Sequence, residues 1–543
     1  MRGVLSTTDA PPAGTLAEPG GAELRGGWRL NPLVDIRPES FGAMAYHFGT
    51  RRLSFLKSRR LLEVVRGLEA HADVTAACRA HGVPERELSA YTRALRTLAE
   101  TDMIVPRAGL GAPAPIDRSE APGTLAMAPT TSGVPAPAAP GSGTRARPSG
   151  TPLVERFQFG LDAPICLTWE LTYACNLACT HCLSSSGRRD PAELSTAECM
   201  RVIDELEAMQ VFYVNVGGGE PTIRRDFFEL LEYATAHHVG VKFSTNGTRI
   251  TPLVAEQLAA SDYVDVQISI DGATAEVNDA VRGPGSYAAA RRAMEHLAEA
   301  GFEGFKLSVV VTRHNVEQLD DLKAIADLYG AQLRVTRLRP SGRAVDVWDD
   351  LHPTADQQRR LYDWLLERGE RVLTGDSFFH LAGYGEALPG LNLCGAGRVV
   401  CLIDPVGDVY ACPFAIHEEF RAGNVRSPGG FAGVWRQSEL FAGLRQPQTG
   451  GACQACSAFD SCRGGCMAAK FFTGLPLDGP DPECVKGHGT GARQSVRPEP
   501  GVDHSRSRPS VPVTLARRPP ARACDESPLA DFALSAPSSS GSG

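Results

Sequence analysis

Three closely spaced cysteines, Cys175, Cys179 and Cys182, follow a strand-like run at 164–171. Three thiolates at this spacing can hold three irons of a cubane cluster and leave the fourth iron open to another ligand. Zinc, the alternative, needs a fourth ligand to complete its tetrahedron, and His181 is held too tightly between two cysteines to serve well. A disulfide cannot use three cysteines. The spacing therefore predicts an iron–sulfur cluster in a loop after a strand.

A glycine run, made of Gly217, Gly218 and Gly219 and followed by Glu220, comes after the next strand-like segment. Successive glycines let the backbone approach a ligand and expose its amides and carbonyls as binding groups, and Glu220 adds a carboxylate. A plain tight turn would explain the glycines by themselves. Beside a three-cysteine loop they predict part of a cofactor site.

Eight further cysteines lie in a segment without clear helical or strand periodicity. They are Cys394, Cys401, Cys412, Cys453, Cys456, Cys462, Cys466 and Cys484. Eight thiolates are enough for two complete four-iron clusters, and metal binding lets such a segment fold with little apolar core. Zinc bound at Cys453 and Cys456 is the alternative.

The elements that must position these groups alternate between strands and helices. The strand-like runs are at 165–171, 211–216, 241–245, 264–270, 306–311 and 333–338, and each is followed by apolar residues at helical spacing. Such a series gives parallel strands with right-handed crossovers, and six units rather than eight predict an α/β fold with an open, partial (β/α)6 barrel. The site is expected at the carboxyl ends of the strands, where the cysteine loop and the glycine run both lie.

Composition divides the rest of the chain. The predicted segments are disordered residues at 1–26, a small α+β domain at 27–106, an Ala/Pro-rich flexible linker at 107–151, the barrel at 152–372, a loop-rich cysteine domain at 373–486 and a disordered tail at 487–543. The chain has 15 cysteines, a formal net charge of −8, no signal-peptide pattern and no apolar run long enough to span a bilayer. These features predict a cytoplasmic protein that binds neither nucleic acid nor membranes and whose clustered cysteines bind metal.

The three-cysteine loop, the glycine run and the six strand–helix units together resemble the radical S-adenosylmethionine (SAM) enzymes. The resemblance implies that the cysteine loop holds a 4Fe–4S cluster whose open iron chelates SAM, and that residues 217–220 line the SAM amino group. Ser269 and Asp271 are implied as ribose contacts, with capping of the strand end as the alternative. Thr245–Gly247 and Arg282 are weaker candidates. In this family the cleaved SAM yields a deoxyadenosyl radical that abstracts a hydrogen atom.

The later cysteines resemble the SPASM extension of peptide-modifying radical SAM enzymes, which carries two auxiliary 4Fe–4S clusters. The family pattern assigns Cys394, Cys401, Cys412 and Cys466 to one cluster. It assigns Cys453, Cys456, Cys462 and Cys484 to the other. The expected cofactors are therefore SAM and three 4Fe–4S clusters, with an electron donor such as ferredoxin or flavodoxin.

Residues 27–106 resemble the small winged-helix, PqqD-like domains that bind the leader of a precursor peptide as an added strand, here beside 53–57. A winged-helix DNA-binding domain is the alternative. The run Tyr46-His47-Phe48-Gly49 and the segments 375–380 and 474–480 bring the likeness closer, to the chaperones and radical SAM maturases of mycofactocin biosynthesis, here fused in one chain.

That closer likeness implies an enzyme that acts on the carboxyl-terminal Val-Tyr of a ribosomal precursor peptide. The Tyr would first be oxidatively decarboxylated and then joined to the Val by a carbon–carbon bond. The fusion also predicts that the amino-terminal domain delivers the precursor in cis. The competing interpretations are a maturase for another peptide or a sulfatase, an iron–sulfur electron carrier and a structural zinc protein.

Overall fold

The computed structural model describes residues 24–50, 52–107, 161–374, 378–386, 388, 394–446 and 453–487. Nearly all of the segments predicted as disordered at 1–26 and 487–543, and of the predicted linker at 107–151, lies outside these residues. Within the described ranges, no helix combines the length and the apolar character needed to cross a membrane.

A three-stranded antiparallel sheet and three helices form the amino-terminal module, a name used here for residues 24–107. The sheet has the order β2-β3-β4, with β2 at Val34–Glu39, β3 at Gly42–His47 and β4 at Arg52–Leu56. The helices are α1 at Arg59–Gly67, α2 at Val74–Ala80 and α3 at Leu88–Glu100, with single turns at Leu68–Ala70 and Glu85–Glu87.

Local signals start two of these helices. The side chains of Ser58 and Asp73 accept hydrogen bonds from the first turns of α1 and α2, as N-cap residues do. Two strands that the sequence did not predict, β1 at Trp28–Leu30 and β5 at Ile104–Pro106, pair with each other and close the module. Each has three residues, too few to show a periodicity.

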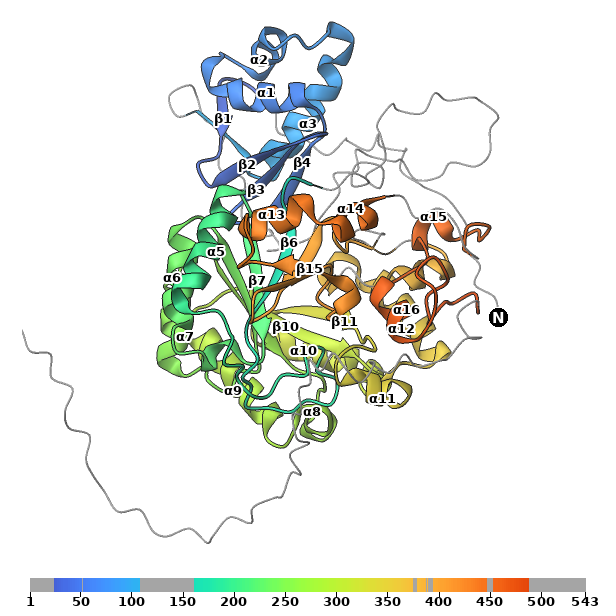
Figure 1. The fold of residues 1–543 in the computed structure, drawn as a ribbon. Helices are drawn as coiled ribbons and strands as arrows, with labels where there is room; N and C mark the ends of the chain where they lie inside the picture. Colours follow the sequence, from blue (N-terminus) through green and yellow to red (C-terminus); the bar gives the residue numbers. More distant parts are fainter. Residues whose placement is uncertain are drawn as a thin grey trace, which may run out of the picture. The chain divides into compact units, whose positions relative to one another are not determined.

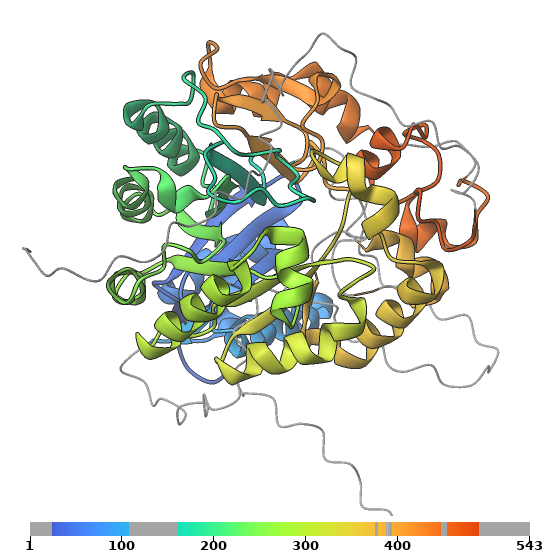
Figure 2. The ribbon, with the colours of Figure 1, turned by 90° about the horizontal axis from the view of Figure 1, so that it is seen from below.

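Six parallel strands, each pairing with the next, form the barrel as predicted (Figure 1). They are β6 at Cys166–Thr172, β7 at Tyr213–Gly218, β8 at Gly240–Thr245, β9 at Val264–Ser269, β10 at Lys306–Val311 and β11 at Gln332–Arg337. Figure 2 shows the helices lying along the outside of the curved sheet.

The barrel helices follow the strands in alternation. They are α5 at Thr196–Ala208, α6 at Phe227–Ala236, α7 at Pro252–Ala259, α8 at Ala275–Arg282, α9 at Ser286–Glu299, α10 at Leu319–Leu328, α11 at Ala344–Leu351 and α12 at Ala355–Arg368. Short 3-10 turns occur at Pro221–Ile223, Val316–Gln318 and Gly369–Arg371. The capping box that Ser195 and Glu198 predict at the start of α5 is present.

The cysteine-rich region continues the barrel sheet, which the sequence did not predict. β12 at Leu373–Thr374 pairs with β11, and β13 at Val400–Ile403 pairs in parallel with β6, followed by antiparallel β14 at Asp408–Tyr410 and β15 at Arg421–Asn424. The helices here are α13 at Gly430–Gln437, α14 at Glu439–Arg445, α15 at Phe459–Cys462 and α16 at Met467–Phe472, with 3-10 turns at Phe379–Tyr384 and Glu418–Phe420. β13 is short and wholly apolar, so only its pairing with β6 identifies it as a strand.

Candidate active site

The three-cysteine loop leaves β6 at its carboxyl end, as predicted from its place in the sequence. Cys175, Cys179 and Cys182 are half-buried. Burial is the main cause that raises the pKa of the Cys175 thiol to about 11, and the two neighbouring thiols add to it by repulsion. Burial also raises the pKa of Cys179. A thiol with the raised pKa of Cys175 keeps its proton until a metal displaces it, because iron binds the thiolate.

Arg343, just beyond the end of β11, holds this loop from the far side of the barrel. Its Nε donates to the carbonyl of Cys179 at 2.8 Å and its Nη1 to the carbonyl of Ser186 at 2.8 Å. Its backbone N–H donates to the carbonyl of Cys182 at 2.9 Å. Gly342 has φ +56°, and a Cβ there would lie 2.3 Å from the carbonyl oxygen of Leu183. The turn at 342–343 therefore packs directly on the loop backbone.

Asp271, proposed from the sequence as a ribose contact, supports the same loop. Its Oδ2 lies 2.9 Å from His181 Nε2 and 2.6 Å from Arg282 Nε, and its Oδ1 accepts from the backbone N–H of Val310 at 2.7 Å. Burial alone would raise the pKa of Asp271, but Arg282 and His181 outweigh it and hold this pKa well below its ordinary value. The carboxylate therefore fixes His181 and Arg282 beside the cysteines, and its role as a ribose contact stays a prediction.

Ser269 stays a predicted SAM contact, and His181 in the cysteine loop is a second polar residue, not proposed from the sequence, that a bound SAM could meet. Ser269, the last residue of β9, is half-buried. His181 Nδ1 is buried and has no hydrogen-bond partner among the described residues. A buried donor or acceptor without a partner costs free energy. A polar ligand against the loop would remove that cost, so the residues present fit a bound SAM.

The glycine run at the end of β7 lies against the start of the cysteine loop. The N–H of Gly219 donates to Thr172 O at 2.7 Å and that of Glu220 to Ala174 O at 2.8 Å. A Cβ at Gly219 would lie 1.9 Å from Ala174 O, so close approach requires glycine there. A Cβ at Gly217 would meet nothing within 4 Å. The three glycines therefore differ, and Gly217 is the one that faces space for a ligand.

Glu220 joins the ends of two neighbouring strands. Its carboxylate accepts from the hydroxyls of Thr222 and Thr245 at 2.5 and 2.8 Å and from the backbone N–H of Asn246 at 2.8 Å. It is 1% exposed, and burial raises its pKa. Thr245 and Asn246, weaker candidates from the sequence, are thus drawn to the glycine run by this side chain.

Four of the later cysteines line one cavity. They are Cys453, Cys456, Cys462 and Cys484, the set that the family pattern assigns to a single auxiliary cluster. His380 and Asp481 line it too. Burial raises the pKa of Cys462 to about 12, so this thiol also depends on a metal to ionise.

Of the four cysteines assigned to the other auxiliary cluster, three lie close together. Burial is the main cause that raises the pKa values of Cys394 and Cys412, and each is raised further by Cys466, so these three thiols are close neighbours. Cys401 is fully buried in β13, near the guanidinium of Arg445. Its place as the fourth ligand stays a prediction.

A buried ion pair that the sequence did not reveal joins this region to the barrel. Arg337, the last residue of β11, donates to both oxygens of Asp481 at 2.9 and 2.5 Å and to Glu483 Oε2 at 2.6 Å. Asp481 Oδ2 also accepts from the backbone N–H of Cys466 at 2.8 Å. Arg337 and Arg343 are single arginines without a surrounding motif, so no sequence signal identified them.

The described residues include no group of three or more His, Cys, Asp or Glu side chains gathered around one point as ligands of a single metal ion are. In a cubane cluster each cysteine binds a different iron, so its ligands need not meet at one point. Cys78 and Cys199 are buried among apolar residues, where the sequence assigned them no role.

Family models match three parts of the chain. The peptide chaperone MftB family matches residues 27–105, the radical SAM superfamily matches 169–326 and an iron–sulfur cluster-binding domain, SPASM, matches 394–457.

Curated relatives match the same parts. The mycofactocin maturase MftC of Mycolicibacterium smegmatis is 72% identical over 383 residues, which are 69% of this chain and 98% of that protein. MftC of Mycobacterium tuberculosis is 71% identical over 384 residues, with the same coverage. The peptide chaperone MftB of Mycobacterium ulcerans is 51% identical over 107 residues, which are 20% of this chain and 96% of that protein.

Among solved structures, Streptococcus suis SuiB bound to the precursor peptide SuiA has a TM-score of 0.57. It is 18% identical, and the match covers 84% of this chain and 99% of that one. The likeness is one of fold.

Proposed function

The chain belongs to the mycofactocin maturase family, and from that premise we propose that it modifies the carboxyl-terminal Val-Tyr of a ribosomal precursor peptide. It is a radical SAM enzyme, a peptide maturase of mycofactocin biosynthesis, with a chaperone-family domain in the same chain. The proposed first step removes the carboxyl group of the Tyr as CO2 together with two hydrogens, with SAM as the two-electron oxidant, and leaves a carbon–carbon double bond in the tyramine unit. In the second, a Val C–H bond would be broken and the Val carbon would add across that double bond, so this carbon–carbon bond needs no further oxidant.

One observation carries this proposal: the cysteine loop and the glycine run are hydrogen-bonded to each other at the carboxyl end of the sheet, with open space at Gly217. In the proposed site Cys175, Cys179 and Cys182 hold the SAM cluster. Gly217 leaves room for the SAM amino group. When bound, the reduced cluster supplies the electron that cleaves SAM to a deoxyadenosyl radical. Arg343 and Asp271 keep the loop in place.

We further propose three 4Fe–4S clusters in each chain. The cavity lined by Cys453, Cys456, Cys462 and Cys484 supports the assignment of one auxiliary cluster, and the neighbouring thiols of Cys394, Cys412 and Cys466 support the other. Anaerobically reconstituted protein should then contain about twelve irons per chain. A ceiling of about four irons, with zinc in the remaining sites, would contradict the auxiliary clusters.

The precursor is proposed to bind the module through its leader. β4 is an edge strand of the β2-β3-β4 sheet, so a peptide could add to it as a further strand. The electron donor is expected to be a ferredoxin or flavodoxin.

The test is an anaerobic incubation of the full chain with SAM, reductant and a precursor that ends in Val-Tyr. Expected products are 5′-deoxyadenosine and a peptide lighter by CO2 and two hydrogens. With a matched peptide that lacks the final Tyr, the enzyme should still release deoxyadenosine, but the peptide mass should not change. The Cys179→Ala variant should release no deoxyadenosine with either peptide. Release of deoxyadenosine with an unchanged Val-Tyr peptide would point to another substrate.

A further inference from the structure

The amino-terminal ends of the barrel strands carry an apolar surface, at the end of the sheet opposite the cysteine loop. Its residues precede or begin β6, β7, β9 and β13. They are Leu161, Ile165, Phe212 and Val399, which are buried, and Tyr213, Tyr263 and Val400, which are partly buried. The other residues of this apolar cluster belong to the module.

β3 of the module packs against this barrel surface with one of its two faces. All six residues of β3 are buried, although successive side chains of a strand point to opposite faces. Ala43 and Ala45 belong to the module's own core, whereas Met44 and Tyr46 pack on the barrel surface with Phe48 just beyond the strand. A strand that is apolar on both faces needs a partner on each. The module therefore leaves one face of its sheet incomplete without the barrel.

A buried ion pair fixes the module to barrel carbonyls. Arg37, on β2, is 2% exposed, and its Nε donates to Glu39 at 2.8 Å. Its two Nη groups donate to the carbonyls of Ala163, Pro164 and Gln210 at 2.9, 3.2 and 3.1 Å. The other oxygen of Glu39 accepts from the backbone N–H of Asp162 at 3.1 Å.

These bonds exist only while the two parts are in contact. Separation would leave the guanidinium of Arg37 without its three barrel carbonyls. The Arg37–Glu39 pair itself lies within the module, so separation would expose it and remove only its hydrogen bonds to the barrel. The pair also sets the register of the junction, because three carbonyls at fixed positions accept from one rigid fork of donors.

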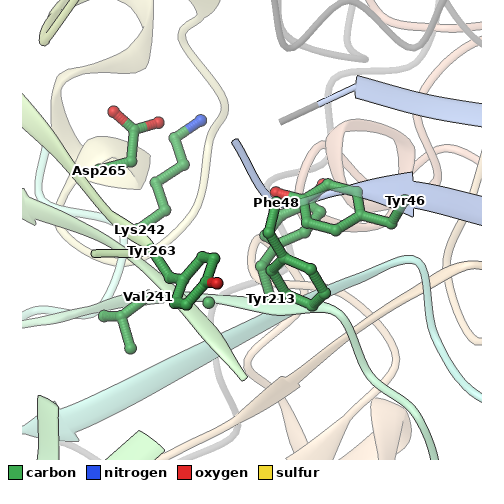
Figure 3. A pocket seen from close by; sticks show the side chains of 8 residues that line it. Tyr46, Phe48, Tyr213, Val241, Lys242, Tyr263 and Asp265 are labelled. Atoms are coloured by element: carbon green, nitrogen blue, oxygen red, sulfur yellow. The ribbon is translucent and has the colours of Figure 1, made fainter. Parts of the chain in front are cut away.

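Aromatic rings of the module and of the barrel also meet at the junction (Figure 3). Tyr46 stacks on Phe212 with ring centroids 5.3 Å apart, and Phe48 meets Tyr263 edge-on at 5.1 Å. The crevice between them, which Tyr213 also lines, has a cavity volume of about 10 Å3, no more than the space one water molecule needs. At this crevice the rings therefore leave room for at most one water molecule between the module and the barrel.

We propose that this junction is a docking interface that holds the module, residues 24–107, on the amino-terminal face of the barrel. The module would stay bound there even without the chain that connects it to the barrel. Three features of the junction support this inference: the hydrogen bonds of the Arg37 guanidinium to barrel carbonyls, the burial of both faces of β3 and the contacts between aromatic rings. It also agrees with the fact that the relatives matched to the two parts are separate proteins.

The test uses the full chain with a specific protease site inserted between 120 and 140. After cutting, the two pieces should elute together in size-exclusion chromatography at micromolar concentration. Arg37→Ala should weaken the association at least about tenfold in a dilution series, because it leaves Glu39 buried and unpaired. Arg79→Ala is the matched control, since its pair with Glu85 is exposed and lies away from the barrel, and it should change nothing.

Phe212→Ala probes the same junction from the barrel side, with the module sequence unchanged, and should weaken the association as well. The iron content of the barrel piece reports that it remains folded. Two results would overturn the proposal: cut wild-type pieces that separate at micromolar concentration, or Arg37→Ala and Phe212→Ala pieces that hold together as tightly as wild type.

Discussion

Arg343 acts on the cysteine loop through backbone atoms, so its effect does not depend on the identity of the loop residues. It satisfies the carbonyls of Cys179 and Ser186, while Asp271 holds His181 between two of the cysteines. These side chains are positioning residues in the proposed site. They hold the backbone that carries the three cysteines before any iron is bound.

Arg343→Ala should reduce iron at the SAM cluster while the auxiliary sites keep theirs. Each buried carbonyl left without its donor costs about 1–3 kcal/mol, and both lie on the loop. Iron should fall from about twelve toward about eight per chain, and the EPR signal that shifts on SAM addition should weaken. Arg359→Ala, whose pair with Asp363 is exposed, is the control. Full iron with an unchanged SAM-sensitive signal in Arg343→Ala would contradict this role.

Asp404 predicts a pH dependence of stability. It lies at the end of β13, 1% exposed, and accepts the O–H of Tyr173 at 2.7 Å. Burial is the main cause that raises its pKa to about 7. An unfolded chain releases this proton near about pH 4, so between about pH 4 and 7 the folded state holds a proton that the unfolded state has lost. Stability due to this group is therefore present at low pH and lost as pH rises to about 7.

The measurement is the thermal midpoint of wild type and Asp404→Asn at pH 5 and pH 8. The neutral amide does not titrate, so the stability of the variant relative to wild type should increase as the pH rises from 5 to 8. The increase in the relative free energy of unfolding should be up to about 3 kcal/mol, from two pH units of linkage. Asp363→Asn, an exposed control on α12, should show no such gain. A constant difference between Asp404→Asn and wild type at both pH values would rule out the raised pKa.

At the scale of elements, the cysteine-rich region is attached to the barrel by sheet pairing and by one charged contact. β13 extends the sheet from β6, and Arg337 at the end of β11 holds Asp481 and Glu483 from a segment more than a hundred residues later. Asp481 in turn fixes the backbone of Cys466. One side chain thus connects a barrel strand to both proposed auxiliary centres.

Arg337→Ala should release this segment and lower auxiliary iron. It leaves two carboxylates buried without a cation, at a cost of about 3–5 kcal/mol. Loss of at least about four irons per chain is expected, with SAM cleavage retained. Arg360→Ala, whose pair with Glu317 is more than half exposed, should cost at most about 1 kcal/mol and no iron. Retention of all iron by Arg337→Ala would show that the segment is held by other contacts.

At the scale of the whole molecule, the module meets the barrel through a packed junction. The predicted linker lies almost wholly outside the described residues, and the expectation of delivery through a flexible tether rested on it. A docked module fixes β4, the strand beside which the leader is proposed to bind, at the end of the barrel away from the cysteine loop. A bound precursor must therefore extend along the barrel to reach the site.

Deletion of residues 1–107 should raise the KM for the precursor at least about tenfold, because leader binding no longer raises its local concentration. Uncoupled SAM cleavage should persist, since the cysteine loop lies at the other end of the sheet. The deletion also exposes Phe212 and its neighbours, so the truncated protein should aggregate more readily. Equal kcat/KM for truncated and full chains would show that the module does not bind the leader.

The residues themselves determined the family, the parallel barrel and the placing of the cysteine loop and the glycine run at strand ends. These features are local. Cys175, Cys179 and Cys182 lie within eight positions of one another. The alternation of strands and helices can be recognised from the spacing of apolar residues along the chain. Residues close in sequence have few ways to be far apart in space, so their spacing alone limits the chemistry they can perform.

Only the tertiary structure decided which distant groups meet. Arg37 is 127 positions from Pro164, Arg343 is 164 from Cys179 and Arg337 is 144 from Asp481. A lone arginine has no periodicity and no motif, and its role depends on which carbonyls or carboxylates the fold brings to it. The same holds for β13, whose four apolar residues become a strand only beside β6, and for β3, whose outer face is core only because the barrel covers it.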